Sequence, residues 1–278
     1  MRKNWRVLVP LSGSVLVVLI LTAWLRPEPG PKYRGKTARQ WVRQLAYSSY
    51  PAVTHEALKE IGPRHAVPVL AHELLGKPAV ASKFYNKLFR KMPLAFQREL
   101  PQPMAIEEYR SLVFYALLRY ERKDLKAAVP ALIRAVQSPD SWARLSATVV
   151  LSNAGNEAVE ALPVLWQHVR KHGAAASMVI DVAASMNAAA AIQKIDPHNV
   201  ELASLLAEWL SEERTPSHVK VWAAKILGRM GSATQFAIPL LIEARDSQDE
   251  ALSNEASDSL QFIQRDVAAQ SPAPSVER

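Results

Sequence analysis

The chain has 278 residues, of which 49% are hydrophobic, 22% charged and 7% aromatic. This composition is normal for a chain that buries a core, and abundant Ala and Leu with only nine Gly favour packed helices over sheets. The absence of cysteine excludes disulfides, thiolate metal sites and a thiol nucleophile.

The net charge of +8 is distributed unevenly along the chain. Residues 1–26 carry 4 basic and no acidic side chains, residues 27–126 carry 18 and 9, and residues 127–278 carry 12 and 17. The chain is therefore basic toward its N-terminus and acidic beyond position 126. This asymmetry indicates orientation at an anionic surface rather than a uniformly basic groove, so we expect no nucleic-acid partner.

Residues 7–25 form an uncharged apolar run that would extend about 28 Å as a helix, close to the thickness of a bilayer core. Trp5 and Trp24 lie at its two ends, where indole rings favour the membrane interface. We predict a membrane anchor over residues 1–26. The alternative is a cleaved signal peptide, but residues 22–25 offer no small-x-small cleavage site.

A basic N-terminus retained inside, with a large domain translocated, is the usual outcome for a leading span. We therefore expect a single-pass protein of the inner (cytoplasmic) membrane, with its main domain in the periplasm. The Pro-rich stretch RPEPGP at residues 26–31 cannot extend the helix, so residues 27–36 are predicted to be a linker.

The remainder predicts an all-α array over residues 37–267, followed by a disordered tail at 268–278. Apolar residues recur at helical spacing in a series of short segments separated by turns. The predicted helices cover residues 37–45, 51–62, 64–75, 106–121, 129–136, 139–154, 162–169, 172–195 with a break near Asn187, 200–210, 217–230, 236–244 and 250–267. Ser138 and Pro139 are expected to begin the sixth of these as cap and first helical residue.

Residues 77–103 interrupt this pattern and form a predicted insertion. Val80, Phe84, Leu88 and Met92 give an apolar stripe on a helix flanked by cations. The candidate binding residues are these cations, Lys83, Lys87, Arg90 and Lys91. Two explanations stay open: the stripe packs on the array while the cations are solvated, or this surface docks onto anionic lipid or an acidic protein.

A proline recurs in the first turns of alternate helices, at Pro68, Pro130, Pro163 and Pro239, with Ala203 in the equivalent position of one unit. A basic residue followed by alanine three positions later recurs in the partner helices, at Arg144 and Lys220. These features resemble HEAT repeats and their shorter relatives. With the apolar N-terminal run, the chain is similar to membrane-anchored bacterial HEAT-repeat proteins. That resemblance implies an α-solenoid of five to six helical hairpins that serves as an interaction scaffold.

Two histidine motifs are candidates for metal sites. His55-Glu56 resembles the dyads of HEAT-repeat hydroxylases of the deoxyhypusine type, but four such dyads in register are needed and only one is in register here. His168 and His172 share a helical face at metal-binding spacing, yet no third ligand is visible, and a role as helix-end histidines is the ordinary explanation. We therefore expect no metal and no cofactor.

The predicted function is a non-enzymatic, membrane-tethered scaffold that binds a protein or peptide partner through its repeat surface. No nucleophile elbow or phosphate loop supports an enzyme. The alternatives are an enzyme on HEAT-like repeats, of the lyase or nucleic-acid glycosylase type, and a module that binds an anionic lipid surface.

Overall fold

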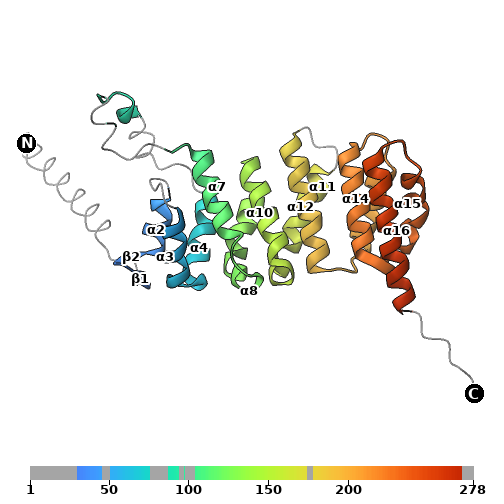
Figure 1. Cartoon of the computed structure of the whole chain (residues 1–278), viewed down its shortest axis with the longest axis horizontal. Coiled ribbons are helices and arrows are strands. Elements are labelled where there is room, and N and C mark those ends of the chain that lie inside the picture. Colours follow the sequence, from blue (N-terminus) through green and yellow to red (C-terminus); the bar gives the residue numbers. More distant parts are fainter. Residues whose placement is uncertain are drawn as a thin grey trace, which may run out of the picture.

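The computed structural model describes residues 30–45, 51–75, 87–93, 97, 104–173 and 178–270. Its helices stand roughly parallel to one another and follow each other along one long axis (Figure 1). The predicted membrane anchor, the first part of the linker, most of the insertion and the end of the tail fall outside these residues. Within the described ranges, no helix is both long enough and apolar enough to cross a membrane.

Most helices are arranged as antiparallel pairs, and successive pairs stack in sequence order, which is the architecture of an α-solenoid. The helices of the N-terminal part are α2 (Ala38–Gln44), α3 (Pro51–Ile61), α4 (Pro63–Leu74), α7 (Ile106–Leu117) and α8 (Arg122–Leu125). Those of the remainder are α9 (Val129–Val136), α10 (Ser141–Ala154), α11 (Leu162–His172), α12 (Val179–Ile195), α13 (Val200–Ser211), α14 (Ser217–Met230), α15 (Ile238–Arg245) and α16 (Glu250–Gln270).

The repeat unit begins with a 3₁₀ turn in three places. These turns are η1 (Lys126–Ala128), η2 (Gly155–Ala161) and η3 (Gly231–Ala237), and each leads directly into a helix with proline as its second residue, at Pro130, Pro163 and Pro239. A proline is tolerated there because its missing N–H has no partner in the first turn. Pro68 differs, because the chain before it is already helical from Pro63 and it lies inside α4.

A small β-hairpin precedes the helices, which differs from the predicted all-α array and linker. β1 (Lys32–Tyr33) pairs antiparallel with β2 (Lys36–Thr37) across a turn in which Arg34 and Gly35 both have positive φ. The indole of Trp41 holds the hairpin against α2 by donating from Nε1 to the carbonyl of Tyr33 at 3.0 Å. The last residues of the predicted linker are therefore part of the fold.

The predicted apolar stripes form one continuous core along the array. Val67, Leu70, Ala71 and Leu74 of α4 and Ala147, Val150, Leu151 and Ala154 of α10 are fully buried, as their spacing predicted. In α3 the helical spacing of Val53, Ala57, Leu58 and Ile61 predicts one apolar face, and this is wrong at Val53, which is 41% exposed while its neighbour Thr54 is buried. The next helix that the structure describes in full after α4 is α7, which follows the predicted insertion in the chain and packs against α4.

Several predicted boundaries needed correction. The cap of α10 is Asp140, whose side chain accepts from the amide of Ala143 at 3.1 Å, and not Ser138. The break in the alanine-rich segment comes at Gly173, where φ is +53°, and α12 runs unbroken through Asn187. The Asn187 amide donates to the carbonyl of Ala183 within the helix at 2.8 Å, so it does not interrupt the turn. α7 ends at Leu117, short of 121, and α16 extends to Gln270, three residues into the predicted tail.

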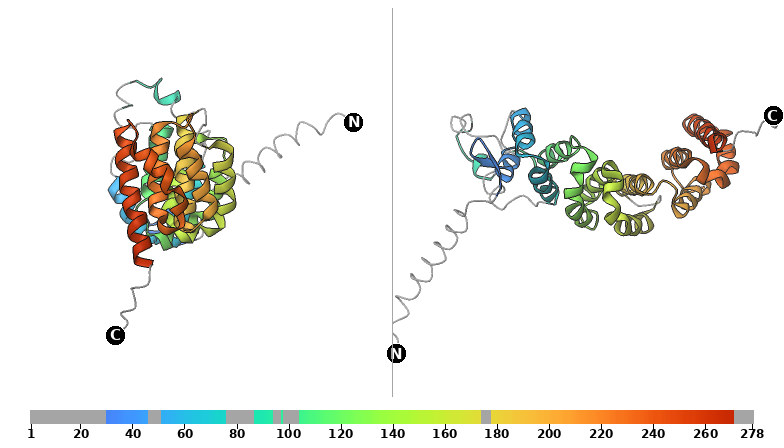
Figure 2. Two further views of the ribbon diagram at one scale, coloured as in Figure 1. Left: turned by 90° about the vertical axis from the view of Figure 1, so that its right-hand side faces the viewer. Right: turned by 90° about the horizontal axis from the view of Figure 1, so that it is seen from below.

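The array bends between α12 and α13, as the right-hand view of Figure 2 shows. On the side that faces the viewer in Figure 1, α12 packs along α10, and α14 packs along α16. In contrast, α12 meets α13 and α14 at only a few points. The junction between α12 and α13 is therefore the sparsest contact between successive pairs in the central and C-terminal part of the array.

Candidate protein-binding surface

The predicted basic helix of the insertion is seen only in part. Lys83, Val80 and Phe84 lie outside the described residues. Lys87, Arg90 and Lys91 are exposed, the chain is helical over 87–89, and a turn follows. The buried apolar residue in this stretch is Phe89, at 8% exposure, whereas Leu88 of the predicted stripe is 42% exposed. The described part therefore keeps the cations in solvent but shifts the apolar contact by one residue.

The two histidine motifs lie apart from each other. His55 belongs to α3, and His168 and His172 belong to α11. Among the residues that the structure describes, no group of three or more His, Cys, Asp or Glu side chains is placed to hold a metal ion.

His168 is a buried histidine. Its ring stacks on His172 with centroids 4.7 Å apart, it is only 4% exposed, and its Nε2 makes no hydrogen bond within the described part of the chain. Burial lowers the pKa of His168 to about 4, and the positive charges of His172 and Arg144 add to this effect. His168 is therefore neutral at pH 7 and occupies a core position.

A buried ion pair beside His168 joins α10 to α12. Arg144 donates to the carboxylate of Asp181 at 2.5 Å and also to the Ser138 carbonyl at 2.8 Å and the Ser141 hydroxyl at 2.6 Å. Burial alone would raise the pKa of Asp181, but the hydrogen bond and charge of Arg144 hold it below its ordinary value. This pair fixes the first turn of α12, and the basic position of the predicted Arg144–Ala147 motif is therefore structural.

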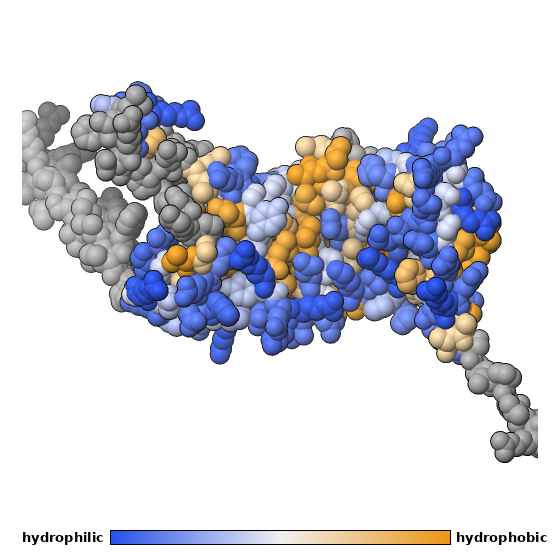
Figure 3. Space-filling view, viewed as in Figure 1, coloured by the Kyte–Doolittle hydropathy of each residue, from blue (hydrophilic) through white to orange (hydrophobic). Residues whose placement is uncertain are grey.

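The outward side of α12 is apolar, which is unusual for an exposed helical face. Val179, Ala183, Met186 and Ala190 fall at helical spacing on this side. Val179 is exposed and the other three are half-buried, and Met186 and Ala190 also pack against the core. Val179 is 80% exposed and the preceding Met178 is 53% exposed. Figure 3 shows the resulting hydrophobic area over the upper half of α12. We name Met178, Val179, Ala183, Met186 and Ala190 the α12 stripe.

Other helices of the array expose single large hydrophobic residues among polar ones. In α16, Phe262 is 57% exposed between Gln261 and Gln264, and in α7 Tyr115 is 61% exposed. The α12 stripe also borders the sparse junction with α13, so no neighbouring helix covers it along that edge. The sequence contained this signal, because α12 reads VIDVAASMNAAAAIQKI with few polar residues on any side. The sequence analysis described this segment as a long helix and did not predict that its first residues stay exposed.

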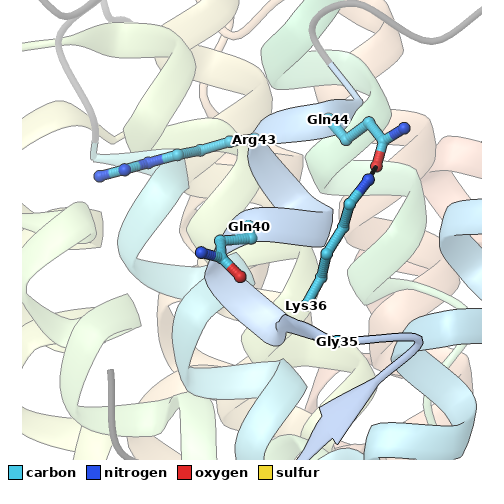
Figure 4. A pocket seen from close by; sticks show the side chains of 5 residues that line it. All are labelled: Gly35, Lys36, Gln40, Arg43 and Gln44. Atoms are coloured by element: carbon cyan, nitrogen blue, oxygen red, sulfur yellow. Dashed lines mark hydrogen bonds between the residues drawn. The ribbon is translucent and has the colours of Figure 1, made fainter. Parts of the chain in front are cut away.

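A second surface feature lies at the N-terminal end of the array. Gly35, Lys36, Gln40, Arg43 and Gln44 line an open, shallow pocket between the hairpin and α2 (Figure 4). The Lys36 ammonium donates to the side-chain oxygen of Gln44 at 2.9 Å and lies 4.8 Å from the centre of the Trp41 ring. The walls of the pocket are mostly the carbon stems of these side chains, and neither Lys36 nor Arg43 forms an ion pair within the described part of the chain.

Comparison with known proteins adds little to this picture. No family model matches the chain, and no curated protein matches it. Among solved structures, an engineered protein from the Northeast Structural Genomics Consortium is 19% identical, with a TM-score of 0.43 over 82% of this chain and 97% of its own. A designed armadillo repeat protein is 16% identical, with a TM-score of 0.40 over 81% of this chain and 99% of its own. Scores this low support no inference, so the assignment as an α-solenoid rests on the packing of the chain's own helices.

Proposed function

We propose that this protein is a non-enzymatic scaffold, tethered to the inner membrane by residues 1–26, that binds a protein or peptide partner through the α12 stripe. The uncovered apolar side of α12 is the observation that supports it most. Monomeric proteins rarely leave contiguous apolar surface exposed, and such surface marks interaction sites. The stripe follows one helical face, so the partner chemistry it fits is a segment that presents apolar side chains at matching spacing, such as an amphipathic helix.

The stability of the array does not depend on the exposed end of the stripe at Met178 and Val179, whereas Met186 and Ala190 also pack against the core. Val179 is almost fully exposed, so a change there removes little buried area, and the Arg144–Asp181 pair holds the first turn of α12 from beneath. Residues that contribute to binding can therefore be altered while the fold is retained.

The test is site-directed photo-crosslinking in membranes. A photoreactive amino acid at Val179 is expected to give a discrete protein adduct, and Ala183→Lys in the same chain is expected to abolish it. The matched control places the crosslinker at Val159, which is 54% exposed on η2. Equal adducts at both positions, or an adduct that survives Ala183→Lys, would contradict binding through the α12 stripe.

The membrane tether and the periplasmic location are proposed from the apolar run at residues 7–25. Alkaline carbonate should leave the full chain in the membrane fraction. Because the chain has no cysteine, a single Gln261→Cys reports its side of the membrane. We expect a membrane-impermeant maleimide to label it in cells whose outer barrier is opened. Labelling only after the inner membrane is broken would place the array in the cytoplasm.

Contact of the insertion with anionic lipid is an alternative use of Lys83, Lys87, Arg90 and Lys91. Three of the four are seen to be exposed, which such contact requires. The charge-reversal experiment described in the next subsection includes a variant with these four residues changed.

A further inference from the structure

We infer that the hairpin and α2 form a basic cap that lies against anionic phospholipid headgroups. We name Lys32, Arg34, Lys36 and Arg43 the basic cap. This surface is distinct from the insertion and deepens the proposed membrane tether, on which its placement depends. It rests on three properties of the described residues: charge without counter-charge, a rigid display of the cations, and position in the chain.

The charge of this element is not balanced locally. Residues 29–55 contain five Lys and Arg side chains and no Asp or Glu. All four residues of the basic cap are exposed. Ion pairs among the described residues involve other cations, and none joins the basic cap to a carboxylate. The partner of Lys36 is the neutral amide of Gln44, which leaves its charge uncompensated.

The fold holds these cations in place rather than on a mobile chain. The hairpin turn is fixed by positive φ at Arg34 and Gly35 and by the hydrogen bond from Trp41 to Tyr33. Arg34 lies over the Tyr33 ring at 5.2 Å and Lys36 over the Trp41 ring at 4.8 Å. In Figure 4, Lys36 extends toward Gln44 and Arg43 extends to the other side of α2. Both side chains are exposed, so each cation can meet a phosphate group from solvent.

Chain length limits how far the basic cap can lie from the membrane. Leu25 ends the predicted span and Lys32 begins the hairpin, so the connection reaches about 25 Å at most when fully extended. Cations held this close to an anionic bilayer are attracted to it, and the attraction falls off within a Debye length. The first element of the array therefore sets the orientation of the remainder relative to the bilayer.

The experiment uses the full chain reconstituted into vesicles of phosphatidylcholine, with or without phosphatidylglycerol. A single Pro31→Cys, exposed beside Lys32, is labelled from outside with an impermeant fluorophore that donates energy to a headgroup acceptor dye. We expect higher transfer in the anionic vesicles, and molar salt should abolish the difference. A label at Gln261→Cys, on α16 at the other end of the array, should show no dependence on lipid charge.

Charge reversal then identifies the surface. Changing Lys32, Arg34, Lys36 and Arg43 to Glu should reduce transfer in anionic vesicles to the neutral-vesicle value, and the corresponding four changes to Gln should reduce it in part. Two matched sets also reverse four charges: the insertion set Lys83, Lys87, Arg90 and Lys91, and the exposed set Arg134, Arg214, Arg229 and Arg265. Both sets should retain the lipid dependence. Thermal unfolding by circular dichroism verifies that every variant is folded.

The outcomes separate the basic cap from the tether. Equal transfer in both kinds of vesicle, or loss in the insertion variant but not in the cap variant, overturns the basic cap and leaves the tether standing. If alkaline carbonate removes the chain from neutral vesicles, the proposed tether is wrong. In that case the basic cap would still be supported if the chain binds anionic vesicles and the cap variant does not. A chain that floats with neither kind of vesicle overturns both.

Discussion

Gly228 lies where α14 and α16 come closest, and its replacement by Ala tests the packing of the last two helical pairs. An ideal Cβ at this position would lie 2.7 Å from each of three atoms of Ser259: Cα, Cβ and Oγ. Ordinary contact begins at 3.4 Å, so the two helices must separate locally by about 0.7 Å. Since one of the opposing atoms belongs to the backbone, a change of side-chain rotamer cannot relieve the contact.

The expected net effect of Gly228→Ala is a loss of about 2 kcal/mol in the free energy of unfolding, because overpacking costs about 3 kcal/mol and the better helix propensity of Ala returns about 1. For a domain of this size that corresponds to a fall of about 4–8 °C in Tm, measured by circular dichroism. Propensity alone predicts the opposite sign, so a variant whose Tm rises or stays unchanged would refute the close contact.

Two further variants isolate the cause of this loss. Ser259→Ala removes only the hydrogen bond from the Ser259 hydroxyl to the carbonyl of Ala224, at 2.9 Å, and should cost about 1 kcal/mol. The double variant Gly228→Ala/Ser259→Gly removes two of the three short contacts and should be more stable than the summed effects of Gly228→Ala and Ser259→Gly, each measured alone, predict.

Three other measurements test the polar groups of the array. The pKa of His168 is about 4 in the folded protein and about 6.5 in the unfolded chain. The free energy of unfolding should therefore fall by about 3 kcal/mol as pH drops from 6.5 to 4, and the fall should be smaller in His168→Leu. No such fall would show that the ring is solvated. The lowered pKa of Asp181 acts in a separate window, below about pH 4. Arg144→Met leaves a buried carboxylate and should cost about 3–5 kcal/mol in denaturant unfolding, whereas Arg144→Met/Asp181→Leu should recover most of it; an equally unstable double variant would show that the pair is not the cause. Thr37→Ala removes the cap that accepts from the Gln40 amide and should cost about 1 kcal/mol, seen as faster hydrogen exchange in α2 but not in α10.

Periodicity was sufficient to predict the helices and most of the core, because each helix buries one side and the apolar residues must repeat at its period. The errors arose where two local signals competed. Ser138 and Asp140 are both good caps by residue type. Asp140 is the cap in the structure, and its carboxylate also accepts a hydrogen bond from Arg110 of α7 at 2.5 Å, a tertiary contact that local sequence does not show. Asn187 disfavours helix interiors, but its amide bonds the preceding turn and the flanking alanines keep the helix intact.

The candidate surfaces were harder to predict, because they depend on what does not pack. α12 has apolar residues on every side, so its sequence alone cannot show which side a neighbour covers. The basic residues at 32–43 were visible in the sequence, but their arrangement depends on a hairpin of two-residue strands, too short to give an alternating pattern. The contact from Trp41 to Tyr33 links two segments by tertiary packing, which local propensity does not report.

The sparse contact at the junction between α12 and α13 affects how the array deforms. In an array where each pair contacts only its neighbours, elastic strain concentrates at the weakest interface. We therefore expect the angle between the part that ends with α12 and the part that begins with α13 to vary more than the distances between helices within either part. A partner that binds both α12 and α14 would restrict this angle. Its binding would therefore change the distance between the two ends of the array.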